Sequence, residues 1–201
     1  MKEVEASLKQ SEIGYLIFDQ VEPNPRDTTV YKAVDIFKKE GANVLIAVGG
    51  GSVMDCAKAV GVIAQYGGEV AAYDGIDLVP GPITPLIAIP TTSGTGSEVT
   101  PVSVITLTKT HMKMGIVDYH VRPAFALVDP ALTYTLPPSL TVGTGLDALT
   151  HAIECYTCVL ASPVTDVLAM RAIQLIAESL PQAAKDGSDR EARQGMSLGS
   201  L

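Results

Sequence analysis

Short apolar runs alternate with amphipathic segments along the first two thirds of the chain. Strands are predicted at 15–20, 43–48, 85–90 and 124–129, and a β-hairpin is predicted over 102–118 with its turn around Lys109 and Thr110. Helices are predicted between them, over 28–41 with Asp27 as N-cap and Gly41 as stop, and over 52–66 with Gly67 and Gly68 at its end. The continuous apolar run at 43–48 is typical of a strand buried on both faces. This alternation predicts βαβ units and a mainly parallel sheet.

The pattern changes after the Pro-Pro pair at 137–138. Only helical periodicity follows, over 144–160, 162–180 and 188–201, with Ser162 as N-cap and Pro163 at the first position of the second helix. In the first of these helices one apolar stripe is predicted to face a helical core, formed by Leu146, Leu149, Ile153 and Tyr156. The sequence therefore predicts an α/β domain over residues 1–137 and an all-α domain over residues 138–201.

Composition excludes several classes of protein. With 201 residues, 47% of them hydrophobic and a mean hydropathy of +0.28, the chain has ample material for a core. The net charge of −8 and the scattered basic residues argue against nucleic acid as a partner. No apolar run approaches the roughly 20 residues that cross a bilayer. The three cysteines have no spacing typical of a secreted disulfide framework, so a soluble, cytoplasmic protein is expected.

The stretch GGGSVMD at 49–55 follows an apolar strand and opens a predicted helix. Glycine allows positive φ and close approach of a ligand, and the helix N-terminus favours an anion such as phosphate. Ser52 would supply a hydroxyl, and Asp55 would lie one turn further along. The spacing matches neither G-x-G-x-x-G nor a P-loop, and a tight turn that needs glycine only for chain reversal is the alternative.

A second loop with many hydroxyl groups, PTTSGTGSEVT at 90–100, follows the strand predicted at 85–90. In a parallel sheet it would lie at the same carboxyl edge as the glycine triplet, where open α/β sheets bind ligands. The alternative is a solvent-exposed loop made of ordinary turn residues. Two phosphate-compatible loops at one edge favour binding.

Asp147 and His151 lie at i, i+4 in the first helix of the all-α part, with Glu154 at i+7. Such a pair can direct a carboxylate and an imidazole toward one metal ion. A simple Asp–His hydrogen bond on a helix surface is the alternative. Cys155 and Cys158 lack a second pair of ligands for zinc and are interpreted as small buried hydrophobic residues.

Three motifs occur together in a family's order: GGGSVMDCAKA, PTTSGTGSEVT and VDPALTYTLPPSLTVGTGLDALTHAIE. From about residue 15 onward the chain resembles the iron-containing (group III) alcohol dehydrogenase family. The resemblance implies NAD or NADP as cofactor, a divalent metal, Fe²⁺ or Zn²⁺, and Asp147 and His151 as two of its four ligands. It also implies that the cofactor contacts Gly49, Gly50, Gly51, Ser52, Asp55, Thr91, Thr92, Thr95, Val104 and Lys113.

Members of this family carry an additional βα unit at the start and two later histidine ligands, and this sequence contains neither. The chain is therefore expected to be an internal portion of a longer enzyme, with a dinucleotide-binding domain at 1–137 and an incomplete metal-binding domain at 138–201. The resemblance also leads us to expect a homo-oligomer, dimer or larger. The expected function is hydride transfer between a small alcohol, or its aldehyde or ketone, and NAD(P), with the metal polarising the substrate oxygen. A nucleotide-binding module without metal chemistry and a hydroxyacid–oxoacid transhydrogenase are the alternatives. No residue is assigned as a catalytic acid or base.

Overall fold

The computed structural model describes residues 2–201. The chain forms two compact units, and each contains segments that are far apart in the sequence. The first unit consists of Met1–Val48, Ser52–Ile87 and Pro101–Ala124. The second unit consists of Gly49–Gly51, Ala88–Thr100 and Phe125–Leu201. Among the described residues, no helix is long and apolar enough to cross a membrane.

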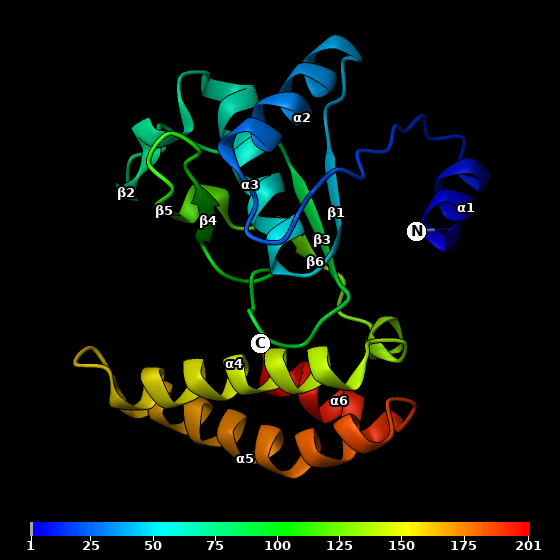
Figure 1. Cartoon of the computed structure of the whole chain (residues 1–201), viewed down its shortest axis with the longest axis vertical. Helices are drawn as coiled ribbons and strands as arrows, with labels where there is room; N and C mark the ends of the chain where they lie inside the picture. The colour runs from blue at the N-terminus through cyan, green and yellow to red at the C-terminus, as the bar shows by residue number, and fades with distance from the viewer. Residues whose placement is uncertain (1) are drawn as a thin grey trace. The chain divides into compact units, whose positions relative to one another are not determined.

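In the first unit, helices α2 (Asp27–Lys39) and α3 (Gly51–Tyr66) pack against a small sheet, whereas α1 (Lys2–Gln10) buries no side chain and lies apart from the sheet (Figure 1). The unit also has 3₁₀ turns η1 (Val70–Tyr73) and η2 (Tyr119–Val121). The sheet has the order β2-β5-β4, formed by β2 (Gly75–Ile76), β4 (Val102–Thr106) and β5 (Lys113–Val117). Strands β4 and β5 are antiparallel, with Thr106 opposite Lys113, which confirms the predicted hairpin.

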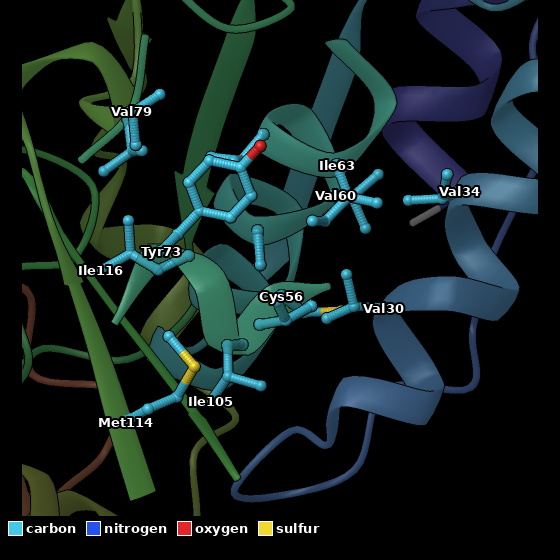
Figure 2. Packing of buried hydrophobic residues seen from close by; sticks show 14 residues of the cluster. Val30, Val34, Cys56, Val60, Ile63, Tyr73, Val79, Ile105, Met114 and Ile116 are labelled. Atoms are coloured by element: carbon cyan, nitrogen blue, oxygen red, sulfur yellow. The ribbon is translucent and has the colours of Figure 1, made fainter. Parts of the chain in front are cut away.

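The core of the first unit lies between α2, α3 and the hairpin. Figure 2 shows Val30 of α2 beside Cys56 of α3, with Ile105 and Met114 of the hairpin close by. All four side chains are buried. Burial raises the pKa of the Cys56 thiol to about 12, with further contributions from Glu22 and Asp55, so this thiol stays protonated and unreactive.

Helix α2 ends as its sequence predicts. Gly41 has φ +66, and the N–H groups of Gly41 and Ala42 donate to the carbonyls of Lys38 and Phe37, which is a Schellman motif. The predicted N-cap is displaced by one residue. Arg26 is the N-cap, and Asp27 is the first helical residue, whose carboxylate accepts from the N–H groups of Thr28 and Thr108.

A second sheet has the order β1-β3-β6, with strands β1 (Leu45–Gly49), β3 (Leu86–Pro90) and β6 (Phe125–Ala126). The Leu45 N–H donates to Pro85, and the Thr91 N–H donates to Gly49. Residue numbers thus increase together along both strands, so β1 and β3 are parallel, as predicted.

Two strand predictions need correction. Neither sheet includes residues 15–20, and Leu16 and Ile17 are exposed, because within residues 2–201 no strand lies beside this segment to complete a ladder. Strand β1 is not buried on both faces as predicted: Ala47 on one face is buried, whereas Ile46 on the other face is exposed, because the described residues leave that face uncovered.

The second unit contains three α-helices and the 3₁₀ turn η3 (Pro130–Thr133). The helices are α4 (Pro138–Thr157), α5 (Pro163–Lys185) and α6 (Arg190–Gly199). Ser162 caps α5, and its side chain accepts from the Thr165 N–H in a capping box, as predicted. Helices α4 and α5 run side by side (Figure 1), and small residues allow their close approach. A Cβ atom at Gly145 would overlap Leu180.

The predicted buried stripe of α4 is wrong. The buried face carries Thr141, Gly145, Ala148 and Ala152, whereas Leu146, Ile153 and Tyr156 are exposed and only Leu149 is partly buried. Close packing against α5 and α6 selects the small residues of α4, since larger side chains would hold the helices apart. Cys155 and Cys158 are also exposed rather than buried, because they lie where α4 ends.

Arg193 of α6 is buried, with 2% of its surface exposed. Its guanidinium donates to the carbonyl oxygens of Gly187 and Leu136 and to the Thr141 hydroxyl, at 2.9, 3.2 and 2.9 Å. Burial lowers the pKa of Arg193 from its ordinary value. One side chain therefore fastens the start of α4 and the residues before it to α6.

Candidate functional site

The glycine triplet forms the turn between β1 and α3. Strand β1 ends at Gly49, and α3 begins at Gly51. The first N–H groups of an α-helix have no partner within the helix, and the helix dipole places partial positive charge there. The amides at the start of α3 therefore favour an anionic group, as expected for a phosphate-binding turn.

The structure shows a different reason for glycine at this turn. Positive φ is not what requires it, because the glycines with positive φ in the described chain are Gly41, Gly67, Gly68, Gly75 and Gly96. Instead, the triplet approaches threonine side chains of the second loop. A Cβ atom at Gly51 would lie 2.7 Å from both Oγ1 and Cγ2 of Thr95. A Cβ atom at Gly50 would lie 3.2 Å from Oγ1 of Thr92.

The second loop lies directly beside the glycine turn. The Thr91 N–H donates to the Gly49 carbonyl at 3.0 Å, which joins the ends of β1 and β3. The Thr95 hydroxyl oxygen accepts from the Ser97 N–H at 3.2 Å, and Gly96 turns the chain with φ +61. The predicted proximity of the two loops is therefore confirmed, and the ligand that they bind stays a prediction.

The same loop rests on helices of the second unit. The Ser93 and Ser197 hydroxyls are 3.2 Å apart and buried, which links the loop to α6. A Cβ atom at Gly94 would lie 2.8 Å from the backbone oxygen of Thr144, three residues before Asp147 on α4. Sequence reasoning missed Gly94 and Thr144, because no local pattern reveals which helix a loop contacts.

The remaining predicted cofactor residues lie in the first unit. Asp55 is on α3, one turn after Ser52, and its Oδ2 accepts from the Val104 N–H at 3.1 Å. Val104 and Lys113 both belong to the hairpin and are exposed. The register places their side chains on the same face of the sheet, opposite the buried Ile105 and Met114.

The predicted metal pair is brought together on α4. The Nε2 atom of His151 lies 3.9 Å from Oδ1 of Asp147, and about half of each side chain is exposed (52% and 47%). Ligand atoms bind zinc at about 2.0–2.2 Å, so two atoms at this separation can share one ion. Among residues 2–201, no group of three or more His, Cys, Asp or Glu side chains is placed to hold a metal. The described residues thus fit two coordination positions of an ion.

Comparison with known proteins decides the family. The family model for iron-containing alcohol dehydrogenase matches residues 1–130, and the model for the C-terminal part of the Fe-containing alcohol dehydrogenase family matches residues 141–201. The chain belongs to the iron-containing alcohol dehydrogenase family. The resemblance found from the three motifs is thereby confirmed, together with the α/β fold followed by an all-α part.

Relatives in this family are similar over nearly the whole chain. The NAD-dependent methanol dehydrogenase of Bacillus methanolicus is 44% identical over 97% of this chain and 51% of its own length. The 1,3-propanediol dehydrogenase of Citrobacter freundii is 44% identical over 96% of this chain and 50% of its own length. The chain therefore spans about half the length of these iron-containing alcohol dehydrogenases.

Solved structures of family members share the fold. A crystal structure of 1,3-propanediol oxidoreductase superimposes with a TM-score of 0.97 at 43% identity, covering 100% of this chain and 52% of that chain. The sulfoacetaldehyde reductase of Bifidobacterium kashiwanohense, in complex with NAD⁺, gives 0.89 at 37% identity, covering 99% of this chain and 55% of that chain. The domain boundary after residue 137, the oligomeric state and the cytoplasmic location stay predictions.

Proposed function

We propose that this chain takes part in NAD(P)-linked interconversion of small alcohols and their aldehydes or ketones, with a divalent metal at Asp147 and His151. The observation that carries the proposal is the packing of Thr92 and Thr95 against Gly50 and Gly51 at the start of α3. This packing places the hydroxyl groups of Thr92 and Thr95 beside the N-terminus of α3, whose first N–H groups have no partner within the helix, and together they suit a dinucleotide's phosphate and ribose groups. Relatives named as NAD-dependent or solved with NAD⁺ support NAD as the cofactor.

In this proposal the residues of the chain bind the cofactor and the cation and hold them in position. The amides at the start of α3 take the diphosphate charge, and Thr91, Thr92, Thr95 and Ser52 supply hydroxyl groups for the rest of the cofactor. Asp147 and His151 supply a carboxylate oxygen and an imidazole nitrogen to the cation. When bound, the cofactor accepts or donates the hydride, and the cation, Fe²⁺ or Zn²⁺, polarises the substrate oxygen.

A second candidate is a nucleotide-binding module without metal chemistry. It is favoured by one observation: in the described part of the chain only two ligands meet at α4, whereas catalytic zinc sites use three protein ligands. Titration with NADH, followed by its fluorescence, tests the binding that both candidates share. Saturable binding is expected, and its absence would contradict both. Turnover of short alcohols in the presence of Fe²⁺ or Zn²⁺ distinguishes the enzyme from the module.

Substitution of Asp147 by alanine tests the metal site. We expect the affinity for Zn²⁺, measured by equilibrium dialysis, to fall about tenfold, because one of two ligands is lost. The fold should be retained, since Asp147 is exposed and surface substitutions change stability by only about 0.5 kcal/mol. Glu154→Ala, on the same helix, is the control and should bind Zn²⁺ as before. Unchanged Zn²⁺ binding in Asp147→Ala would remove the assignment.

A further inference from the structure

The first half of α3 carries two charged residues that point toward strand β4 of the hairpin. Asp55 and Lys58 are three positions apart, so they lie on the same face of the helix. Lys58 is fully buried, with 0% of its surface exposed. A buried ammonium group is stable only where oxygen atoms compensate its charge. The buried Lys58 ammonium group therefore requires specific oxygen partners, unlike a lysine on the solvent-exposed surface.

These two residues hold three consecutive residues of β4. The Lys58 ammonium donates to the Val102 carbonyl at 2.7 Å. The Ser103 hydroxyl donates to the backbone carbonyl of Asp55 at 2.7 Å. The Val104 N–H donates to the Asp55 carboxylate at 3.1 Å. The short Lys58 bond carries a full charge, which makes it among the stronger hydrogen bonds in proteins.

Strand β4 needs such partners because it is an edge strand. The sheet order is β2-β5-β4, so one side of β4 pairs with β5, and on the other side the described residues form no further strand but a single bridge between Arg26 and Thr106. Val102 and Val104 are two residues apart and present their backbone groups to that same open side. At the end of the strand the Thr106 N–H donates to Pro25 on this side. Side chains of α3 thus take the place of a neighbouring strand.

We propose that Asp55 and Lys58 are positioning residues, which fix the hairpin to the helix that begins at the glycine turn. This inference rests on the proposed function, because the hairpin carries Val104 and Lys113, two of the predicted cofactor contacts. Asp55 acts through the Val104 N–H, and Lys58 acts through the Val102 carbonyl. Since the Lys58 side chain is entirely covered by protein, it does not touch a cofactor directly, and its bond to the Val102 carbonyl connects it to the hairpin.

Lys58→Met tests the proposal, because it keeps most of the apolar stem and removes the ammonium donor. Hydrogen–deuterium exchange of peptides covering 102–106 is expected to accelerate in the absence of any cofactor. The Kd for NADH is expected to rise about fivefold, because a hairpin that is less firmly fixed holds its predicted cofactor contacts, Val104 and Lys113, less well in position. Lys109→Met is the matched control, as its ammonium is exposed and pairs only weakly with Glu69 at 3.7 Å. It should change neither quantity.

Two further variants keep the test decisive. Asp55→Asn retains an oxygen that can accept from Val104 and should protect 102–106 better than Asp55→Ala. If Lys58→Met does not fold, Ser103→Ala removes one hydrogen bond of the set, and faster exchange over 102–106 is expected there instead. Unchanged exchange in the folded variants overturns the proposal. So does faster exchange combined with unaltered NADH affinity.

Failure of the proposed function gives a different result. In that case the unsubstituted chain itself does not bind NADH, while exchange over 102–106 still accelerates in Lys58→Met. This outcome removes the link to the cofactor and leaves the attachment of β4 to α3 as a purely structural feature, so it overturns the positioning role. The two proposals are therefore separated by the unsubstituted chain alone.

Discussion

Gly51→Ala is expected to weaken NADH binding about thirtyfold, and in a chain that already carries Thr95→Ala the same substitution is expected to have little further effect. The added Cβ would lie 2.7 Å from two atoms of the Thr95 side chain, which is too close for any real contact. Overpacking of this kind costs about 1–3 kcal/mol, and about 2 kcal/mol corresponds to thirtyfold in affinity. The chain can relieve it only by moving the two loops apart, which separates the groups that bind the dinucleotide.

The double variant separates two reasons for the glycine. After Thr95→Ala, the nearest contact of the new Cβ is the Cβ of residue 95 at 3.0 Å, which a shift of a few tenths of an ångström relieves. We therefore expect Gly51→Ala/Thr95→Ala to bind NADH about as well as Thr95→Ala alone, a clear departure from additivity. If the diphosphate itself requires glycine, the two losses add instead. Gly143→Ala, where a Cβ meets no atom within 4 Å, is the control for the glycine-to-alanine change.

Arg193→Ala is expected to lower the free energy of unfolding by about 3 kcal/mol or more. The substitution removes three hydrogen bonds from a charged donor and leaves two carbonyls and the Thr141 hydroxyl without this partner. Each buried polar group left unsatisfied costs about 1–3 kcal/mol. The midpoint of urea unfolding should therefore fall, with little change in its slope.

Two other variants serve as comparisons for the loss of stability in Arg193→Ala. Arg190→Ala, in the first turn of the same helix, removes an exposed guanidinium and should change stability by no more than about 0.5 kcal/mol. Arg193→Lys keeps the charge but cannot donate in three directions from a planar group, so it should be nearly as destabilising as alanine. An Arg193→Ala chain as stable as the Arg190→Ala chain would show that α6 is held mainly by its apolar contacts.

Structural features that depend on signals within a few residues were predicted correctly from the sequence. The Ser162 capping box, the stop at Gly41 and the glycines after α3 each depend on neighbours within about one helical turn. The hairpin and the parallel pairing of β1 with β3 also follow the pattern of apolar residues. The two candidate loops were identified because glycine and threonine cluster where these strands end, and their role as a binding site stays a prediction.

Only the tertiary structure decided which faces are buried and why certain residues are needed. The apolar stripe of α4 was misassigned because close helix packing favours Gly145, Ala148 and Ala152 over leucine. Lys58 follows Met54 on the buried face of α3, and nothing local shows that the Val102 carbonyl is there to receive its ammonium group.

The sequence by itself determined the hairpin, the parallel pairing of β1 with β3, the helix ends at Gly41 and Ser162 and the location of both loops, because these depend on short-range geometry and residue type. The tertiary structure alone decided that Gly50 and Gly51 make room for threonine side chains, that α3 completes the edge of β4, and that Arg193 joins α6 to the start of α4. These features depend on contacts between residues about 40 to 50 positions apart, which no local pattern encodes.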